Sequence, residues 1–315
     1  MTHFASVIKQ KALSLGFCDC GITDCSAIAI EFIQAFEQRI ANQQIADLNF
    51  LTKNKEKRYA PQLLVPEAKS IIVVLANYYQ NIPYLDNGNY KIALYAWGND
   101  YHQVIKNKLK ILQQFILENI DKNSINRYFV DTAPTMDKYL AYRAGLGWIG
   151  KNTLLHGKEG SFCCIGLLFT SVILETDQPY HNNPCLHCDI CIKACPTKAL
   201  LKPYCLDAKQ CWAYQTIENK ERINITDKTN KQQYIYGCDI CQKVCPHNRD
   251  LPQTTIKEFF PNKELTLIND GQIEHMTNET FNTLFAHTPI KRIGYEKMKD
   301  NISTITRWRN LKSNI

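Results

Sequence analysis

Nine of the fourteen cysteines lie between residues 185 and 245, and seven of them form two runs whose spacing is typical of iron–sulfur ligands. The first run, C-x2-C-x2-C-x3-C-P, consists of Cys185, Cys188, Cys191 and Cys195. In two-cluster proteins, the first three thiolates of such a run hold one 4Fe-4S cluster and the fourth holds the neighbouring cluster. The second run consists of Cys238, Cys241 and Cys245. Ile235 stands where its first cysteine would be, so a further thiolate is needed, and Cys205 and Cys211 are the candidates.

If the last cysteine of each run ligates the cluster held mainly by the other run, the chain holds two sets of four ligands. The first set is Cys185, Cys188, Cys191 and Cys245. The second is Cys195, Cys238 and Cys241 with one of the two candidates. Pairs of the C-x2-C type also build zinc sites, but a proline after the last cysteine of each run favours clusters over zinc. Clustered thiols of this kind indicate a reducing compartment, so we expect a cytoplasmic protein.

A second group of residues able to do chemistry surrounds Asp131. This carboxyl group ends a predicted apolar strand at residues 127–131, where it can point into a pocket at the edge of a sheet and transfer protons. It could instead cap the next helix. Farther along, Gly145, Gly147 and Gly150 match G-x-G-x-x-G, but they follow a helical pattern and open no helix, so dinucleotide binding is not indicated. We expect these glycines to allow the backbone to approach a bulky ligand.

The elements that position these groups alternate between helix and strand before residue 176, which predicts an α/β domain. Helices are expected at residues 4–15, 27–43, 101–119 and 135–144, and strands at 70–76, 92–96, 127–131 and 161–174. Residues 176–250 contain too few apolar side chains for an ordinary core, so we expect the clusters to hold them together. We therefore predict three units, a catalytic α/β domain at 1–175, a two-cluster domain at 176–250 and a C-terminal tail at 251–315.

Charge distinguishes this tail from the rest of the chain. The net charge of the 315 residues is only +7, yet residues 288–315 carry seven basic and two acidic side chains. The basic ones are Lys291, Arg292, Lys297, Lys299, Arg307, Arg309 and Lys312. Interleaved with Tyr295 and Trp308, they suit a phosphate backbone with exposed bases, although a solvated helix face has the same composition. No apolar stretch approaches the roughly 20 residues of a membrane span, so we expect no membrane association.

Several segments together resemble the epoxyqueuosine reductases, the enzymes of the last step in making the queuosine base of tRNA. They are KRYAPQLLVPEAKSII at 57–72, YAWGNDYHQVIKNKL at 95–109, VDTAPTMDKYLAYRAGLGWIGKNTLL at 130–155, both cysteine runs, and LDAKQCWAYQTIE at 206–218. The resemblance implies a cobalamin-binding α/β domain related to reductive dehalogenases, a ferredoxin-like domain with two 4Fe-4S clusters and a short helical tail. It also implies that electrons pass through the clusters to cobalamin, whose reduced cobalt attacks the epoxide of the substrate.

The resemblance assigns roles to individual residues of this chain. It implies that Cys211 is the eighth cluster ligand and that Asp131 is the proton donor, with a pKa raised by burial beneath the corrin ring. The implied cobalamin contacts are Arg58, Asp131, Asn152, Leu155, Ile165, Asp239 and Ile240. Because the family resembles those that bind cobalamin without a protein ligand, His102 is expected to have a supporting role. Lys138 and Lys158, which flank the acid and the glycines, are expected to contact tRNA phosphates.

The resemblance also fixes the expected partners. These are a tRNA bearing epoxyqueuosine and an external low-potential electron donor, and we expect a monomer. Two other functions use part of the same features. A two-cluster electron carrier would need the cysteines but would leave residues 130–155 unexplained, and a cobalamin-dependent reductase of a small substrate would leave the basic tail unexplained.

Overall fold

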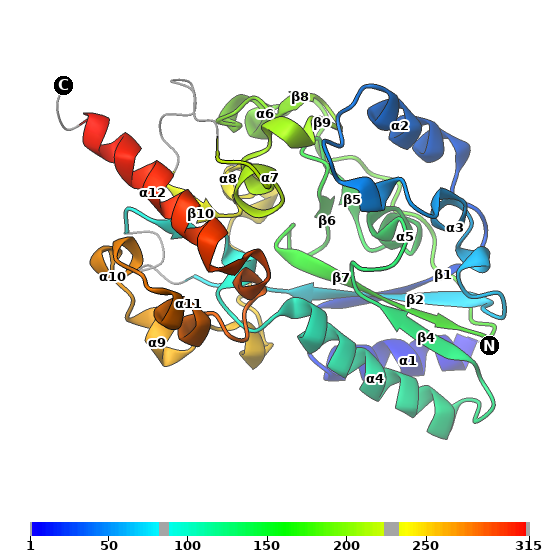
Figure 1. Ribbon diagram of the computed structural model, residues 1–315. Helices are drawn as coiled ribbons and strands as arrows, with labels where there is room; N and C mark the ends of the chain where they lie inside the picture. Colours follow the sequence, from blue (N-terminus) through cyan, green and yellow to red (C-terminus); the bar gives the residue numbers. More distant parts are fainter. Residues whose placement is uncertain (1, 82–87, 224–232, 313–315) are drawn as a thin grey trace.

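The computed structural model describes residues 2–81, 88–223 and 233–312 (Figure 1). Its centre is a four-stranded sheet with the order β1-β2-β7-β4, in which all neighbouring strands are antiparallel. The four strands are β1 (Asp19–Asp24), β2 (Ser70–Asn77), β7 (Cys163–Thr170) and β4 (Asn126–Phe129). Figure 1 shows helices on both faces of this sheet, which is the predicted α/β architecture.

Strand β2 explains why both faces are covered, because all eight of its residues are buried. Ile72, Val74 and Ala76 face one core, which they share with α1 (Thr2–Ser14) and α4 (Tyr101–Asn119). The alternate residues Ile71, Val73 and Leu75 face a second core with α5 (Asp137–Arg143). Since successive side chains of a strand point to opposite faces, a continuous apolar run places the strand between two layers of helices.

Seven of the eight helices and strands predicted before residue 176 are present in the structure, and the exception is the strand at 92–96. Residues 92–96 do not form a strand of the main sheet. Only β3 (Lys91–Ile92) is extended, paired in parallel with β10 (Tyr234–Tyr236), and Leu94–Ala96 is a 3-10 helix. Strand β1 was not predicted, because its sequence DCGITD lacks an apolar run. It forms because it pairs with β2 along its whole length, and Gly21 lets α5 approach closely.

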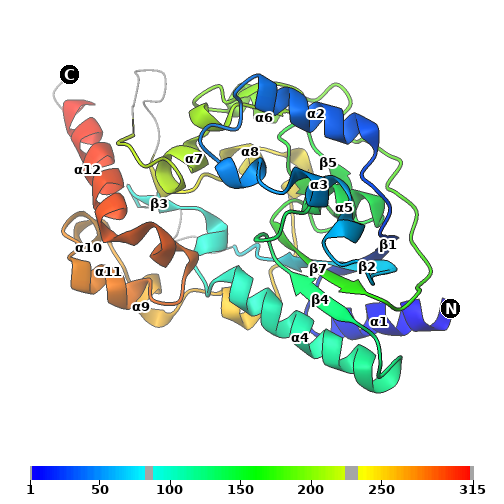
Figure 2. The same ribbon diagram turned by 45° about the vertical axis from the view of Figure 1, so that its right-hand side comes forward.

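The cysteine-rich segment consists of short elements packed above the α5 side of the sheet (Figure 2). They are α6 (Ile190–Ala194), β8 (Leu200–Lys202), β9 (Cys205–Leu206), α7 (Trp212–Ile217), β10 and α8 (Ile240–Lys243). Helices α6 and α8, one from each cysteine run, lie in contact. The β3–β10 pairing ties this segment to the first 175 residues. Because a strand pairing crosses the predicted boundary at residue 175, the division into domains at residues 175 and 250 stays a prediction.

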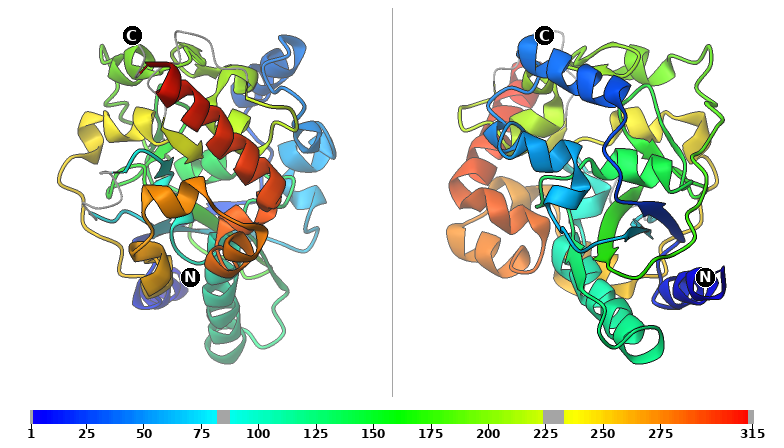
Figure 3. Two further views of the ribbon diagram at one scale, coloured as in Figure 1. Left: turned by 60° about the vertical axis from the view of Figure 1, so that its left-hand side comes forward. Right: turned by 90° about the vertical axis from the view of Figure 1, so that its right-hand side faces the viewer.

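The C-terminal part is helical, as predicted, and it is built into the molecule. Its helices are α9 (Lys263–Thr266), α10 (Asp270–Glu274), α11 (Asn278–Leu284) and α12 (Gly294–Lys312). Helix α12 packs against α7 and β10 (Figure 3). Its buried Asn301 donates hydrogen bonds to the carbonyls of Thr216 and Ile235, at 2.8 and 2.9 Å. Within the described ranges, no helix is long and apolar enough to cross a membrane.

The missing side chains of the G-x-G-x-x-G glycines would meet protein atoms, so packing within the chain accounts for these glycines without the bulky ligand that the sequence suggested. They belong to the hairpin of β5 (Trp148–Ile149) and β6 (Leu155–His156) and its approach. A Cβ on Gly147 would lie 1.9 Å from the backbone oxygen of His156, and one on Gly150 would lie 2.6 Å from the His156 ring. These glycines are needed for close packing within the chain.

This packing makes Gly147→Ala strongly destabilising. Gly147 has a φ of +145°, and the added methyl group would overlap the His156 carbonyl, so we expect a loss of about 3 kcal/mol or more in the free energy of unfolding. Gly271→Ala in α10 is the matched control, because its Cβ would meet only one side-chain atom at 3.4 Å. Chemical denaturation measures both variants. Equal stability of the two would contradict the packing argument.

Candidate active site and cluster-binding cysteines

Asp131 lies where the chain leaves the sheet. It follows β4 and buried Val130 and has a φ of +56°, a left-handed conformation that Asp tolerates better than most residues. Strand β4 pairs only with the last four residues of β7, so the first residues of β7, at 163–165, have no β4 residue beside them and are partly exposed. Helix α5 begins only at Asp137, with Met136 as its N-cap, so Asp131 does not cap it.

Two side chains from the start of α4 hold the Asp131 carboxylate. The Tyr101 hydroxyl donates a hydrogen bond to Asp131 Oδ2 at 2.7 Å, and His102 Nε2 lies 3.7 Å from the same oxygen. The other ring nitrogen of His102, Nδ1, lies 2.8 Å from Asp100 Oδ1. The sequence drew attention to Asp131 but gave His102 only a supporting role and Tyr101 none. Because 28 residues separate His102 from Asp131 in the sequence, their proximity could not be predicted from the spacing.

This arrangement reverses the predicted pKa shift of Asp131. The contacts with His102, the larger cause, and with Tyr101 hold the pKa of the Asp131 carboxyl below its usual range. Burial opposes the charged form of His102, but its contacts with Asp100 and Asp131 raise the pKa of the imidazole to about 9. At neutral pH the pair is therefore a carboxylate beside an imidazolium. At neutral pH the proton that could be transferred is therefore bound to His102, and Asp131 is ionised.

Arg58 holds the segment that connects Asp131 to α5. Its guanidinium donates a hydrogen bond from Nη1 to the Thr135 carbonyl at 2.7 Å, and one from Nη2 to the Phe50 carbonyl at 3.2 Å. The side chain is buried at the end of α3 (Lys55–Tyr59). Its Nε is buried and has no hydrogen-bond partner among the described residues. Nε and the second N–H of each terminal nitrogen are therefore left for the predicted cobalamin contact, while the two donated hydrogen bonds fix the Asp131 loop.

Arg58→Ala is expected to loosen this loop and to lower the free energy of unfolding by about 2–4 kcal/mol, because two backbone carbonyls lose a charged donor in a buried place. Arg222→Ala is the control, since Arg222 is 77% exposed and forms a surface ion pair with Asp300. Denaturation measures the stability, and limited proteolysis reports on the loop. A loss below about 0.5 kcal/mol for Arg58→Ala would exclude this role.

The other predicted cobalamin contacts lie at the junction between the sheet and the cysteine-rich segment. Asn152 is buried, and its amide nitrogen lies 3.5 Å from the backbone oxygen of Cys241. Asp239 is also buried and accepts a hydrogen bond from the Leu94 N–H at 2.7 Å. Leu155 is buried in β6, whereas Ile165 in β7 and Ile240 at the start of α8 are partly exposed. Their contact with cobalamin stays a prediction.

The two lysines predicted to bind tRNA lie in different surroundings. Lys138 is exposed on α5, and its ammonium group donates a hydrogen bond to the Thr153 carbonyl at 2.7 Å. This places it between the Asp131 loop and the β5–β6 hairpin. Lys158 forms an ion pair with Asp19 at 3.3 Å, at the start of β1. No contact among the described residues joins Lys158 to Asp131 or Lys138, so the structure does not bring the two lysines together.

The first predicted set of cluster ligands surrounds one cavity. Its lining includes Cys185, Cys188, Cys191 and Cys245, together with Lys151, His156 and His247. The Lys151 ammonium group donates hydrogen bonds to the carbonyls of Leu186 and Cys188, at 2.6 and 2.7 Å, and so fixes the loop that carries two of the thiols. In the described part of the chain, no three His, Cys, Asp or Glu side chains were found to converge on a single-ion site. The four thiols instead surround a space, as cluster ligands do.

The second predicted set gathers beside the first. Cys195 lies in a small apolar cluster with Ala199 and Leu200, and three further cysteines, Cys191, Cys211 and Cys241, pack against it. Cys238 lies near this set: burial is the main cause that raises the pKa of its thiol, and the neighbouring Asp239, Cys211 and Cys195 raise it further. Cys205 is directed elsewhere, with its thiol 3.5 Å from Gln44 Oε1. The structure thus brings Cys211, and not Cys205, to this set.

The five remaining cysteines show no sign of a reactive thiolate. Burial raises the pKa of Cys20 and Cys163 to about 12 and that of Cys25 to about 11. It also raises the pKa of Cys18 and Cys164. A thiol with a raised pKa is a poor nucleophile at neutral pH. These five cysteines are therefore not candidates for a catalytic nucleophile.

Comparisons with known proteins agree with this architecture. Residues 58–132 match the family model described as "Epoxyqueuosine reductase QueG, DUF1730", and residues 184–248 match a 4Fe-4S double cluster binding domain. The epoxyqueuosine reductase of Cellulophaga algicola is 39% identical over 299 residues, which are 95% of this chain and 96% of that protein.

Solved structures of epoxyqueuosine reductases have the same fold. One of them was determined with a tRNA-Tyr epoxyqueuosine-modified stem loop. Its sequence is 27% identical to this chain, and the two structures match with a TM-score of 0.85, covering 95% of this chain and 80% of that chain. The Bacillus subtilis enzyme is 26% identical, with a TM-score of 0.81 and the same coverage, and its catalytic aspartate loop is swung out of the active site. The chain described here therefore belongs to the epoxyqueuosine reductase family, and it is an oxidoreductase with a 4Fe-4S double cluster binding domain.

Proposed function

We propose that this protein reduces epoxyqueuosine to queuosine in the anticodon of a tRNA, with Asp131 as the proton donor. The observation that carries the proposal is the Asp131 carboxylate, 65% exposed and held by Tyr101 and His102 beside the partly exposed start of β7. A protein that only carried electrons would have no use for this group. Removing the epoxide oxygen as water consumes two electrons and two protons, so the reaction needs both an electron supply and an acid.

The two cysteine sets are suited to supply the electrons. Cys191 of the first set packs against the apolar cluster that contains Cys195 and the second set, so the two clusters would be neighbours. We propose that the first set holds one 4Fe-4S cluster and the second set the other, and that an external low-potential donor reduces them. The second set also adjoins the predicted cobalamin contacts, since Asn152 lies against Cys241.

The residues beside Asp131 fit bound cobalamin. Arg58 Nε is a buried donor without a partner among the described residues, which an amide oxygen at the edge of a corrin could accept. On the α5 face of β7, Ile165 is partly exposed in a strand whose last five residues are buried. When bound, cobalamin would supply a strongly nucleophilic reduced cobalt that opens the epoxide. The protein would orient the substrate, exclude water and provide the proton at Asp131.

The tRNA substrate is proposed from the related structure that contains a tRNA stem loop, and from the basic surface of this chain. Lys138, beside the Asp131 loop, is placed to contact a phosphate near the reacting base. Within the tail, Arg292 is paired with Glu218 and the Lys297 ammonium group donates to the Glu221 carbonyl, so these two groups are already engaged.

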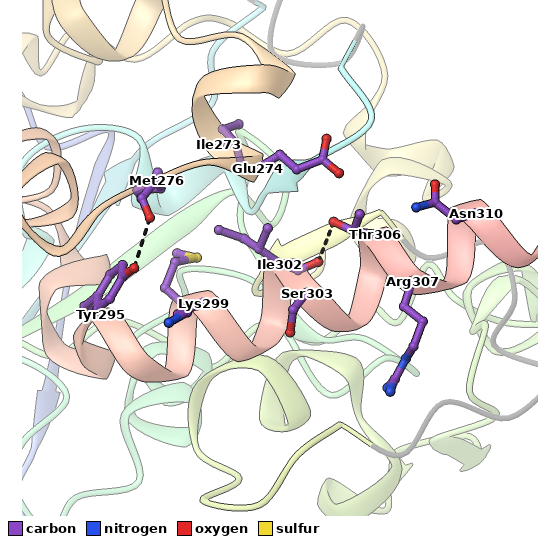
Figure 4. A pocket seen from close by; sticks show the side chains of 11 residues that line it. Ile273, Glu274, Met276, Tyr295, Lys299, Ile302, Ser303, Thr306, Arg307 and Asn310 are labelled. Carbon is purple, nitrogen blue, oxygen red and sulfur yellow. Dashed lines mark hydrogen bonds between the residues drawn. The ribbon is translucent and has the colours of Figure 1, made fainter.

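Two other basic residues of the tail are better placed for RNA. Lys299 and Arg307 are exposed on α12. They line a cavity of about 570 Å³ between α12 and the segment that contains α10 (Figure 4). We therefore narrow the proposed RNA contact of the tail to Lys299 and Arg307. The side chain of Lys312 lies outside the described residues.

A substrate comparison under anaerobic conditions tests the proposal. Protein reconstituted with iron, sulfide and cobalamin would be given a low-potential reductant with either epoxyqueuosine-bearing tRNA or a small organohalide. We expect conversion of the tRNA only, and none without cobalamin. Turnover of the organohalide but not of the tRNA would identify a different substrate class.

A further inference from the structure

The Asp131 site contains two groups that can exchange a proton, and only one of them is the proposed donor. We propose that His102 is the proton reservoir of the site and recharges Asp131 for each turnover. This inference rests on the proposed function, because it requires Asp131 to be the group that protonates the substrate. His102 acts through Asp131 and does not itself touch the substrate.

The geometry fixes His102 for this role. Asp100 caps α4 by accepting a hydrogen bond from the His102 backbone N–H at 2.9 Å, and the same carboxylate oxygen lies 2.8 Å from His102 Nδ1. The Tyr101 ring stacks on the imidazole with its centroid 4.0 Å away. With one ring nitrogen fixed by Asp100, the other faces Asp131 Oδ2 at 3.7 Å. Each ring nitrogen thus faces a carboxylate, an arrangement that favours the imidazolium.

The exposed fractions of the two side chains indicate that the proton moves from His102 to Asp131. The Asp131 side chain is 65% exposed, whereas that of His102 is 25% exposed, so Asp131 is the member that can reach a substrate. The separation of 3.7 Å exceeds the roughly 3.0 Å of an N–H···O hydrogen bond, and a rotation of the Asp131 side chain would close the gap. Contacts of this kind are often loose before the substrate binds.

The proton balance is simple. The Nε2–H bond of the imidazolium breaks and an O–H bond forms at Asp131, which gives a neutral imidazole and a carboxylic acid. The electron pair comes from the external low-potential donor: the carbon atom gains this pair as one C–O bond of the epoxide breaks, and the oxygen becomes an alkoxide that takes the proton from Asp131. His102 then regains a proton from water. Tyr101 donates a hydrogen bond to the carboxylate that remains and so stabilises Asp131 after transfer.

The charged and titratable groups around the pair come from several elements. Asp100 and Tyr101 belong to the start of α4, Cys164 lies on β7, and Asp137 and Lys138 come from α5. Two carboxylates contact the His102 ring, Asp100 at Nδ1 and Asp131 at Nε2. They raise the pKa of His102 to about 9 against the effect of burial, so the reservoir is filled at neutral pH and empties as the pH rises through this value.

The pH dependence of kcat in His102→Gln tests the inference. Gln keeps an amide group that can donate a hydrogen bond near the position of Nε2, but this group does not ionise and cannot transfer a proton to Asp131. For the wild type we expect kcat to stay level through neutral pH and to fall above about 9. For the variant we expect about a 100-fold lower kcat at neutral pH, falling about tenfold for each further pH unit, with little change in KM for tRNA. A variant with the wild-type pH profile would overturn the proposal.

A second readout needs no activity. In an NMR titration of the histidine imidazoles of the protein with both clusters oxidised and without cobalamin, we expect His102 to titrate near 9, and at lower pH in Asp131→Asn and Asp100→Asn. Titration of wild-type His102 at its ordinary value of about 6.5 would refute the reservoir. Asp131→Asn also separates the two proposals. If that variant remains active, the proposed role of Asp131 fails, whereas an inactive Asp131→Asn with an unaltered His102→Gln refutes the reservoir alone.

Discussion

The Asp131→Asn variant is expected to convert epoxyqueuosine about 10²–10⁴-fold more slowly than the wild type while it retains both clusters and bound cobalamin. Asn has the same shape, tolerates the φ of +56° and still accepts the hydrogen bond from Tyr101. It cannot transfer a proton to an alkoxide. The change therefore removes the acid and leaves the fold, so kcat should fall without a loss of stability.

The comparison needs a control and a measure of cofactor content. Asp121→Asn is a matched control, because Asp121 is an exposed carboxylate that accepts a hydrogen bond from the Asn123 N–H in a surface turn. Absorbance spectra should show the same cluster and cobalamin content in all three proteins. Full activity of Asp131→Asn with normal spectra would mean that another group donates the proton.

The second large effect is expected at Cys211. Cys211→Ala should reduce the iron content from about eight to about four atoms per chain and abolish turnover, because one 4Fe-4S cluster loses a ligand. Cys205→Ala is the matched control, since Cys205 was the other candidate from the sequence and its thiol lies 3.5 Å from Gln44 Oε1. It should keep both clusters and nearly full activity. Iron analysis and low-temperature electron paramagnetic resonance of the reduced proteins measure the difference.

The reverse outcome would overturn the ligand sets. A loss of iron from Cys205→Ala with intact clusters in Cys211→Ala would show that the second cluster is held differently. The structure argues against this result, because Cys211 packs with Cys195 and Cys241.

Features that depend on local sequence were predictable. Helix α4 begins and ends where the sequence predicted it, since Asp100 caps it and its apolar residues follow one face. The double cluster binding domain belongs to this class as well, because the spacing of its cysteine runs is set by the clusters that such domains bind. The 3-10 helix at Leu94–Ala96 was not predictable, because its apolar residues fit a buried strand equally well. Strand β1 was missed because only its partner β2 makes it a strand.

The chemistry of the site was less predictable than its location. The sequence identified Asp131 by its place after a strand, but the pKa of a carboxyl depends on groups that the fold brings to it. Tyr101 and His102 come from the start of a helix, and their contact with Asp131 exists only because α4 packs beside β4. Similarly, the role of Arg58 follows from its contact with Thr135, which lies 77 residues away in the chain. Such long-range contacts leave no spacing pattern.

The most direct test of the account is a single-turnover experiment on tRNA. Anaerobic protein with both clusters and cobalamin, reduced beforehand, would be mixed with epoxyqueuosine-bearing tRNA, and the digested nucleosides would be analysed by mass spectrometry. If the protein reduces epoxyqueuosine as proposed, one queuosine, with a mass lower by one oxygen atom, forms for each epoxyqueuosine lost, and no conversion occurs when cobalamin is omitted. Unchanged epoxyqueuosine after incubation with fully loaded, reduced protein would contradict it.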